Sequence, residues 1–220
     1  MCSMEMILKQ PLNPLEYEEL NDLFDDAYTV FQVELNLRDN RPTLFGKRIF
    51  IDATSEIDGK IIGFWHAASN GPAEDSKFEM LPCANDDAIG KCIFECNMDH
   101  PENFLKDTNR TPCIYRACRV GWISQIIRIA DSCKKPNTII VWTSDNQRGE
   151  KFLNLRYRCG SIDYIVIFKI SYKNKEIVCF RLITAYPIVL RRYKRRYEKE
   201  CRDFDALKKK PTFLRKFFET

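Results

Sequence analysis

The stretch "TIIVWTSDNQRGEKFLNLRYRCGSIDYIVIFKISYKNKEIVCFRLITAY", residues 138–186, decides the fold. It holds four runs rich in β-branched and aromatic residues, and such runs favour strands. The connections "SDNQRGE", "CGSI" and "KN" are short enough to join antiparallel neighbours as hairpins. We therefore expect a four-stranded antiparallel meander.

Helical patterns flank the meander on both sides. Before it, Thr111 and Pro112 suit an N-cap followed by proline at the first helical position, and "CIYRACRVGWISQIIRIADSC" continues with apolar residues at helical spacing. After it, Pro187 ends the last strand, and a basic helix is expected from about Pro187 to Phe204. This order predicts an α+β fold in which a helix packs on the antiparallel sheet.

The amino-terminal part adds further elements to this core. The segment "PLEYEELNDLFDDAYTVFQVEL" predicts one acidic amphipathic helix, and "KRIFID" and "KIIGFWHAAS" predict short strands separated by the turn "SEIDGK". We divide the chain into an amino-terminal helix with strands (1–66), an irregular Cys-containing insertion (67–110), a helix-plus-meander catalytic core with a basic helix (111–206) and a basic tail (207–220).

The formal net charge of +4 is unevenly distributed along the chain. Residues 191–216 hold 12 Lys and Arg against 4 Asp and Glu, a net of +8, so the rest of the chain has a net of −4. A basic end on a slightly acidic body is typical of a surface that binds a polyanion.

The sequence also predicts the cellular location of the protein and the redox state of its cysteines. The first residues show no basic start followed by an apolar run, so we expect no secretory signal and a cytoplasmic location. No stretch is apolar over the length of a bilayer, so we expect no membrane partner. The ten cysteines are scattered, and most are expected to be free thiols in the core.

The last predicted strand ends in hydroxyl groups. Side chains alternate along "VCFRLITAY", so Thr184 and Tyr186 continue the apolar row of Phe180 and Leu182, and the row turns polar at the margin of the sheet. Such a margin suits a binding or catalytic site. The alternative is that Thr184 is an ordinary strand residue and Tyr186 a core aromatic with its hydroxyl at the surface.

The basic helix that follows is a candidate for phosphate binding. Few acidic residues lie nearby to form pairs four positions apart, although a charge run can also be a solvated helix face. The candidate phosphate ligands are Arg191, Arg192, Arg195 and Arg196.

Three residues outside this end of the chain are candidates for catalysis. His66 closes an apolar run, and histidine is the commonest general acid or base, but it could equally be a structural residue bonded to backbone. Arg116 and Arg119 extend the apolar row of their helix near its start. They suit a bidentate grip on phosphate, or salt bridges to the acidic amino-terminal helix.

The insertion offers a possible metal site. One histidine and three cysteines could complete a tetrahedral zinc set, although the usual C-x₂-C knuckle is missing and steps of four also suit one helix face. The chain has no phosphate-binding P-loop, Rossmann glycine pattern, serine nucleophile elbow, H-E-x-x-H motif or kinase signature, which excludes those classes by motif. The alternative zinc ligands are Cys83, Cys92, Cys96 and His100.

Four segments, "GFWHAAS", "YRACRVGWISQII", "TIIVWTSDNQRGEKF" and "DYIVIFKI…CFRLITAYPI", together resemble a phage-type branch of the barnase–EndoU–colicin–RelE-like (BECR-fold) nucleases. The likeness covers about residues 66–197. It rests on the order of the segments, on Arg-x-x-Arg-x-x-Trp in the helix and on Leu-x-Thr-Ala-Tyr at the last strand. The insertion and the basic carboxy-terminal helix extend past the minimal fold of that family.

The resemblance implies a helix on a curved four-stranded antiparallel sheet and a metal-independent endoribonuclease that acts through the RNA 2′-OH, without a cofactor. It implies a toxin or a phage–host conflict protein acting on tRNA or mRNA, with an antitoxin or other protein as a possible partner. His66 would be the base or acid, and Thr184 and Tyr186 would position ribose or phosphate. Arg116 and Arg119, with Arg148 as a further candidate, would stabilise the phosphate charge.

Three alternatives stay open at this point. The first is a non-enzymatic nucleic-acid-binding or interaction protein, which needs the basic helix but no catalytic histidine. The second is a zinc-organised adaptor built on the cysteines of the insertion. The third is a transferase toxin, because a positively lined cleft also suits nucleotide cofactors.

Overall fold

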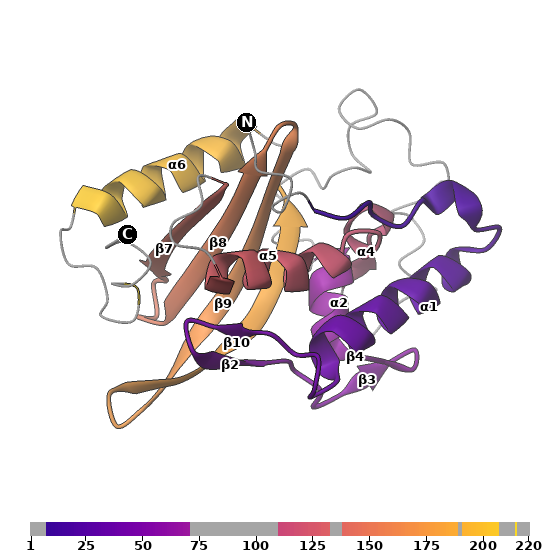
Figure 1. Cartoon of the computed structure of the whole chain (residues 1–220), viewed down its shortest axis with the longest axis horizontal. Helices are drawn as coiled ribbons and strands as arrows, with labels where there is room; N and C mark the ends of the chain where they lie inside the picture. Colours follow the sequence, from indigo (N-terminus) through magenta and orange to yellow (C-terminus); the bar gives the residue numbers. More distant parts are fainter. Residues whose placement is uncertain (1–7, 71–109, 133–137, 189–190, 207–213, 215–220) are drawn as a thin grey trace. The chain divides into compact units, whose positions relative to one another are not determined.

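The computed structural model describes residues 8–70, 110–132, 138–188, 191–206 and 214 (Figure 1). Contacts within the chain divide it into two compact units. The sheet unit comprises Met1–Lys9, Arg41–Ile51 and Ile123–Thr220, and the helical unit comprises Gln10–Asn40 and Asp52–Trp122. Each unit is described separately below.

The sheet unit confirms the α+β class and the predicted antiparallel meander. The four meander strands pair in sequence order, and the turn between the last two uses Asn174 and Lys175, both at positive φ as a tight hairpin requires. The strands in chain order are β1 (Thr43–Leu44), β2 (Lys47–Phe50), β7 (Ile139–Asp145), β8 (Lys151–Cys159), β9 (Ile162–Lys173) and β10 (Glu176–Pro187).

The predicted count of four strands is wrong for the described sheet, which is curved and six-stranded in the order β1-β2-β10-β9-β8-β7. β2 pairs with β10 in parallel, from Arg48 opposite Cys179 to Phe50 opposite Arg181, so the sheet is mixed. The outer edge of β10 would otherwise present unpaired backbone groups, and β2 covers part of it.

One face of the sheet is apolar and holds the core of this unit. Side chains from all of the longer strands alternate onto it, and α5 (Gly121–Ser132) lies across the sheet in Figure 1 with its own apolar row buried. The buried residues of this layer include Leu153, Leu155, Val166, Phe168, Phe180, Leu182, Ala185, Ile123, Ile126, Ile127 and Ala130.

The other face is rich in polar groups, and we call it the polar face. Strand register places its residues in rows across the sheet, such as Trp142 opposite Asn154 and then Ile167. α6 (Arg191–Ala206) packs against part of this face. The polar face includes Trp142, Ser144, Asn154, Arg156, Asp163, Lys169, Arg181, Thr184 and Tyr186, with the apolar Phe152, Ile165 and Ile167 between them and Arg48 and Phe50 of β2 at its edge.

A bulge in β10 changes which side chains share a face. The register shifts between Leu182 and Thr184, where β10 contains one residue more than β9. Ala185, and not Thr184, therefore continues the buried row after Leu182. The regular alternation predicted for this strand is wrong beyond Leu182, because Thr184 and Tyr186 lie on the polar face together with Arg181.

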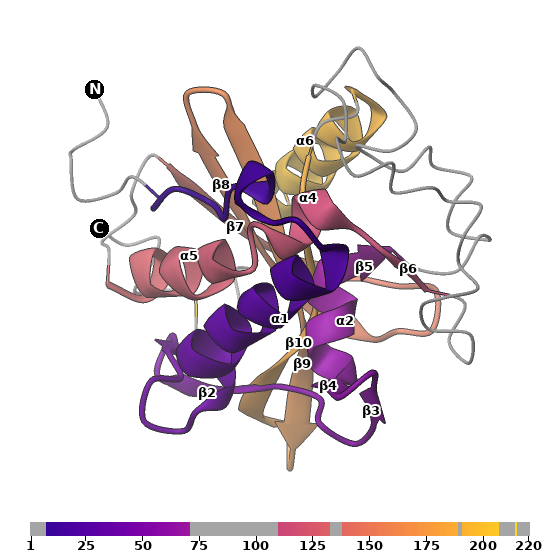
Figure 2. The same ribbon diagram turned by 90° about the vertical axis from the view of Figure 1, so that its right-hand side faces the viewer.

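The helical unit is built around an aromatic core between α1 and α2, which run close together in Figures 1 and 2. Phe24 and Phe31 of α1 contact Trp65 and Phe64 of α2, each with ring centroids 5.6 Å apart. The elements are a 3₁₀ turn (Pro14–Glu16), α1 (Leu20–Phe31), a π-helical turn (Gln32–Asn36), β3 (Glu56–Ile57), β4 (Lys60–Ile61), α2 (Ile62–Ala68), β5 (Ser69–Asn70), β6 (Thr111–Pro112) and α4 (Ile114–Ala117).

Two predicted elements of this unit differ from the structure. The run containing His66 is the helix α2 and not a strand, because a short apolar run buried on all sides fits either element. Thr111 and Pro112 do not start a helix. They pair with Ser69 and Asn70 as β6, and the helical segment begins at Ile114 as the separate α4. Among the described residues, no helix is both long and apolar enough to cross a membrane.

Candidate functional site

The basic helix α6 is anchored to the polar face by aromatic side chains. Tyr197 is buried, with its ring centroid 5.7 Å from that of Trp142 and 6.3 Å from that of Tyr193. Tyr193 also contacts Tyr186 of β10 at 6.1 Å. Tyr193 and Tyr197, which are four positions apart, therefore form the inner row of α6.

Glu200 fixes the orientation of α6 on the sheet. Its carboxylate accepts a hydrogen bond from Trp142 Nε1 of β7 at 3.1 Å and another from Arg196 Nε at 2.9 Å. One carboxylate thus joins the helix to a strand and compensates one arginine of the basic row. Arg196 is held in this way within its own helix.

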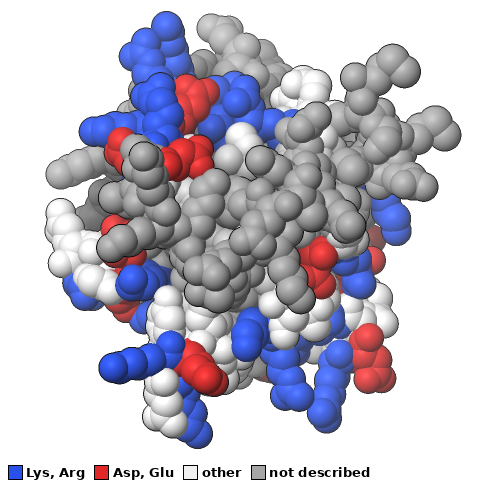
Figure 3. Space-filling model, turned by 60° about the vertical axis from the view of Figure 1, so that its left-hand side comes forward, with Lys and Arg blue, Asp and Glu red and all other residues white. Residues whose placement is uncertain are grey.

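Four further cations of α6, between Arg191 and Lys199, are exposed. Figure 3 shows blue Lys and Arg side chains gathered over the upper part of this face of the molecule, where α6 lies. We call this set the α6 cation row. Its exposed members are Arg191, Lys194, Arg195 and Lys199, and the backbone of Arg192 belongs to the same turn.

A buried ion pair lies on the polar face. Arg156 is 1% exposed, and its Nε and Nη2 donate to the two carboxylate oxygens of Asp163 at 2.8 and 2.7 Å. Nearby, the side-chain amide of Asn154 donates to Ser144 Oγ at 3.0 Å. Buried charge of this kind is tolerated because the fork of the guanidinium matches the carboxylate.

The predicted pair Thr184 and Tyr186 lies on this face, and both side chains are half-buried. The Tyr186 hydroxyl forms a hydrogen bond with the hydroxyl of Tyr197. Burial, and then the neighbouring Tyr186, raises the pKa of Tyr197 well above the usual tyrosine range. Tyr197 therefore stays protonated at neutral pH and can donate to the Tyr186 oxygen.

Further cations on the polar face were missed by sequence reasoning. Arg181 and Lys169 stand directly opposite each other on β10 and β9, and Arg48 lies on the neighbouring β2. The half-exposed Lys169 forms an ion pair with Glu150. Only strand register could have found this set, because its members come from segments far apart in the sequence.

The helical unit uses the predicted Arg116 as a helix cap. Arg116 is 6% exposed; its Nε donates to the Ala67 carbonyl at 3.0 Å and its Nη2 to the His66 carbonyl at 2.7 Å. Arg110 Nε donates to Ser69 Oγ at 2.8 Å beside it. The negative end of α2 is thus covered by two guanidiniums, which gives Arg116 a structural task.

Arg119 is held close to its own helical segment. Its Nη1 donates to the Tyr115 carbonyl at 2.9 Å, and its guanidinium lies 3.5 Å from the centroid of the Tyr115 ring and 5.2 Å from that of Trp122. Contacts of this kind immobilise a cation over aromatic faces. They differ from both uses predicted for Arg119, a phosphate grip and a salt bridge to the acidic helix.

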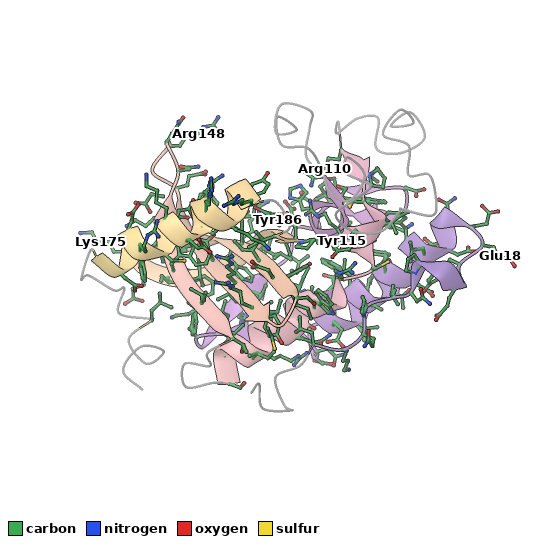
Figure 4. All side chains as sticks on the ribbon, turned by 90° about the horizontal axis from the view of Figure 1, so that it is seen from above. Glu18, Arg110, Tyr115, Arg148, Lys175 and Tyr186 are labelled. Atoms are coloured by element: carbon green, nitrogen blue, oxygen red, sulfur yellow. The ribbon has the colours of Figure 1, made fainter. Side chains whose placement is uncertain are left out.

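The other predicted site residues are distributed as follows. His66 is half-buried on α2 in the helical unit. Arg148, at the tip of the connection between β7 and β8, points away from Tyr186 in Figure 4. The described residues contain no cluster of three or more His, Cys, Asp or Glu placed to hold a metal ion. The zinc set of Cys83, Cys92, Cys96 and His100 lies outside the described residues.

Comparisons with known proteins add no relative to this description. No protein-family model, no curated protein and no solved structure matches the chain.

Proposed function

We propose that the chain binds RNA through the α6 cation row and that it cleaves RNA without a metal ion. One observation carries the binding step: the charges of α6 are arranged against the stability of the helix itself. Its first turn contains no acidic residue and its last turn no basic residue.

Helix geometry explains why this arrangement points to a ligand. The amino-terminal end of a helix has a partial positive charge, so anions stabilise it, and cations there cost about 0.3–1 kcal/mol each. α6 nevertheless begins with Arg191, and Lys194 and Arg195 follow within the first two turns. A phosphate backbone beside these turns would be attracted by both the side chains and the helix end.

The test neutralises the row and measures RNA affinity against salt. For single-stranded RNA the logarithm of the binding constant falls with the logarithm of salt concentration by about 0.7 per neutralised phosphate. The triple variant Arg191→Ala, Lys194→Ala and Arg195→Ala should therefore lower this slope by about 2 and weaken binding to every sequence tested.

The matched control removes cations at the opposite end of β10. Lys173 and Lys175 lie at the β9–β10 turn, the far end of a 12-residue strand from the start of α6. Lys173→Ala with Lys175→Asn should keep the salt slope, and Asn tolerates the positive φ of position 175. An α6 variant that kept the wild-type slope would overturn the binding proposal.

The cleavage step is favoured by the bulge in β10, which places Thr184 and Tyr186 on the face that α6 partly covers. Attack of a ribose 2′-OH on the adjacent phosphate yields a 2′,3′-cyclic phosphate and a 5′-hydroxyl. It requires a proton acceptor, a proton donor and hydrogen bonds to the phosphate. We assign Tyr186 to a hydrogen bond with phosphate or ribose, because Tyr197 fixes its hydroxyl.

Cleavage is tested with purified protein, total RNA and EDTA. Wild-type protein should produce fragments that end in 2′,3′-cyclic phosphate, and Tyr186→Phe should lower the rate about 10²-fold, as loss of one positioned donor does. His66→Ala tests the predicted acid or base, with an expected loss of about 10²- to 10⁴-fold. If wild-type protein binds the RNA but leaves it intact, the cleavage proposal is wrong and only the binding proposal stands.

A further inference from the structure

An exposed aromatic side chain lies on the polar face. Phe50 of β2 is 42% exposed, whereas its neighbour Ile49 is 1% exposed and faces the core. The guanidinium of Arg181 lies 5.6 Å from the centroid of the Phe50 ring, because Phe50 and Arg181 are register partners on β2 and β10. A large aromatic side chain left open to water on a sheet costs hydrophobic free energy that burial would recover.

Cations surround this aromatic side chain in a band across three strands. Arg181 faces Phe50 on one side and Lys169 on the other, and Arg48 is adjacent to Phe50 on β2. Like charges directly opposite each other on neighbouring strands destabilise a sheet. Pairing Arg181 with Lys169 therefore does not by itself stabilise the sheet, and Glu150 offsets the charge of Lys169.

Two of these side chains are held in position by described contacts. Lys169 Nζ is paired with the Glu150 carboxylate, and Asn146 Nδ2 also donates to Glu150 at 2.7 Å. Arg181 is held over the Phe50 ring. A cation that is already ordered loses less conformational freedom when an anion binds to it.

We propose that this band is a binding site for one unpaired nucleotide: its base stacks on Phe50, and Arg48, Arg181 and Lys169 contact the flanking phosphates. An aromatic face accepts any base by stacking, and the cations follow the backbone. A purely apolar partner is disfavoured, because it would take Arg48, Arg181 and Lys169 out of water without offering a group that hydrogen-bonds them. The site deepens the proposed function, since it makes single-stranded nucleic acid the ligand.

The experiment measures the affinity of RNA and DNA hexamers by fluorescence anisotropy, with a 2-aminopurine base as the reporter of stacking. Phe50→Ala should weaken binding of the RNA hexamer about 5- to 150-fold, the range expected for one lost base–aromatic stack, and should abolish quenching of 2-aminopurine. Phe50→Trp should keep both signals. Arg181→Ala should weaken binding and lower its salt dependence.

Tyr172→Ala is the matched control. Tyr172 is 48% exposed, but it lies two residues beyond the buried Ile170 on β9. Tyr172 and Ile170 therefore share the apolar face of the sheet, opposite to the polar face that carries Phe50. This variant should bind like wild type. Equal binding by RNA and DNA hexamers would place recognition on base and phosphate, whereas a preference for RNA would add a contact to the 2′-OH; both agree with the proposal.

The α6 triple variant separates this inference from the proposed function. If that variant loses RNA affinity while Phe50→Ala binds and quenches like wild type, the nucleotide site is wrong and the binding proposal stands. If Phe50→Ala loses affinity while the α6 variant does not, the nucleotide site stands and the role of α6 is wrong. If neither variant differs from wild type, both are wrong.

Discussion

At the scale of single residues, the Arg156–Asp163 pair is a buried ion pair of the sheet unit. Burial alone lowers the pKa of Arg156, whereas Asp163 raises it, and the net direction is upward. The guanidinium of Arg156 stays charged in the folded protein, and each partner offsets the hydration that the other loses on burial.

Breaking this pair should cost more than replacing it. Asp163→Asn leaves a buried guanidinium without its counter-charge, and the free energy of unfolding should fall by about 3–5 kcal/mol. The double variant Arg156→Met with Asp163→Leu removes both charges and should be more stable than Asp163→Asn. Urea unfolding of the two variants and wild type measures the difference; a double variant less stable than the single one would contradict this account.

Two thiols, the buried Cys118 and the half-buried Cys201, predict how stability depends on pH. Burial raises the pKa of Cys118 to about 11 and that of Cys201 to about 12. An unfolded thiol loses its proton near pH 8.5, so above that pH the unfolded state holds fewer protons than the folded state. The contribution of these thiols to the free energy of unfolding should be fully present below about pH 8.5 and should fall as the pH rises towards 11.

Urea unfolding at pH 7.5 and pH 10 checks this dependence. The wild-type protein should be less stable at the higher pH, and Cys118→Ala should reduce the difference between the two conditions. Cys179→Ala offers a control, because Cys179 is only half-buried on β10, whereas Cys118 is buried. An equal reduction in both variants would contradict the role given to burial.

At the scale of elements, periodicity identified the strands of the meander but not their faces. The alternation of "VCFRLITAY" is regular in the sequence, and nothing in it marks Ile183 as the extra residue of a bulge. The bulge depends on how β10 pairs with β9, which is a tertiary property. The strand was therefore predicted correctly, but the side chains after Leu182 were assigned to the wrong face. For this reason the sequence did not show that Arg181, Thr184 and Tyr186 share one face.

Local pattern also failed where tertiary contacts decide between helix and strand. The run "IIGFWHAA" is apolar throughout, so periodicity could not distinguish a buried strand from the buried helix α2. Thr111 and Pro112 carry a helix-start signal, but pairing with β5 overrides it. The basic helix was predicted to within a few residues, because its apolar stripe and the preceding proline are local signals.

The reversed charges of α6 predict that stability and binding can be separated. Arg191→Glu places an anion at the start of the helix, so the free energy of unfolding should rise by about 0.3–1 kcal/mol while RNA affinity falls. Arg202→Glu, near the other end of the helix, should lower stability instead. Urea unfolding and RNA titration of both variants test this; a loss of stability in Arg191→Glu would contradict it.

At the scale of the whole molecule, charge is segregated between the two units. The sheet unit contains 27 Lys and Arg against 11 Asp and Glu, a net of +16. The helical unit contains 8 against 20, a net of −12, and the two values add to the +4 of the chain. The sequence gives every charge, but only the division into units shows that both termini and residues 41–51 share the positive part.

This segregation predicts unusual behaviour on ion exchangers. A protein with +4 spread evenly should bind a sulfonate resin at pH 7 and pass through a quaternary-amine resin. The segregated chain should be retained by both resins at low salt, because each resin is attracted by one unit. Passage through the quaternary-amine resin would contradict a strongly acidic helical unit.

The candidate site was only partly accessible to sequence reasoning. Tyr186, Thr184 and the α6 arginines were found because they are contiguous around Pro187. Phe50 and Lys169 were not, since they are about 120 residues apart and become neighbours of Arg181 only through strand pairing. The sequence placed Arg116 on the apolar row of its helix, but the partners of its side chain are backbone carbonyls that no sequence pattern reveals.

The carboxy-terminal end of α2 is completed by residues that lie far downstream in the sequence, and this affects how the chain folds during synthesis. β5 and β6 hold Asn70 opposite Thr111, and Arg110 and Arg116 complete α2 from more than 40 residues downstream. During synthesis, these side-chain contacts at the end of α2 therefore form only after residues 110–116 have been made. For any flexible connection, each doubling of its length costs only about 0.6 kcal/mol more to close. A change in the number of residues between Asn70 and Arg110 should therefore have little effect on these hydrogen bonds.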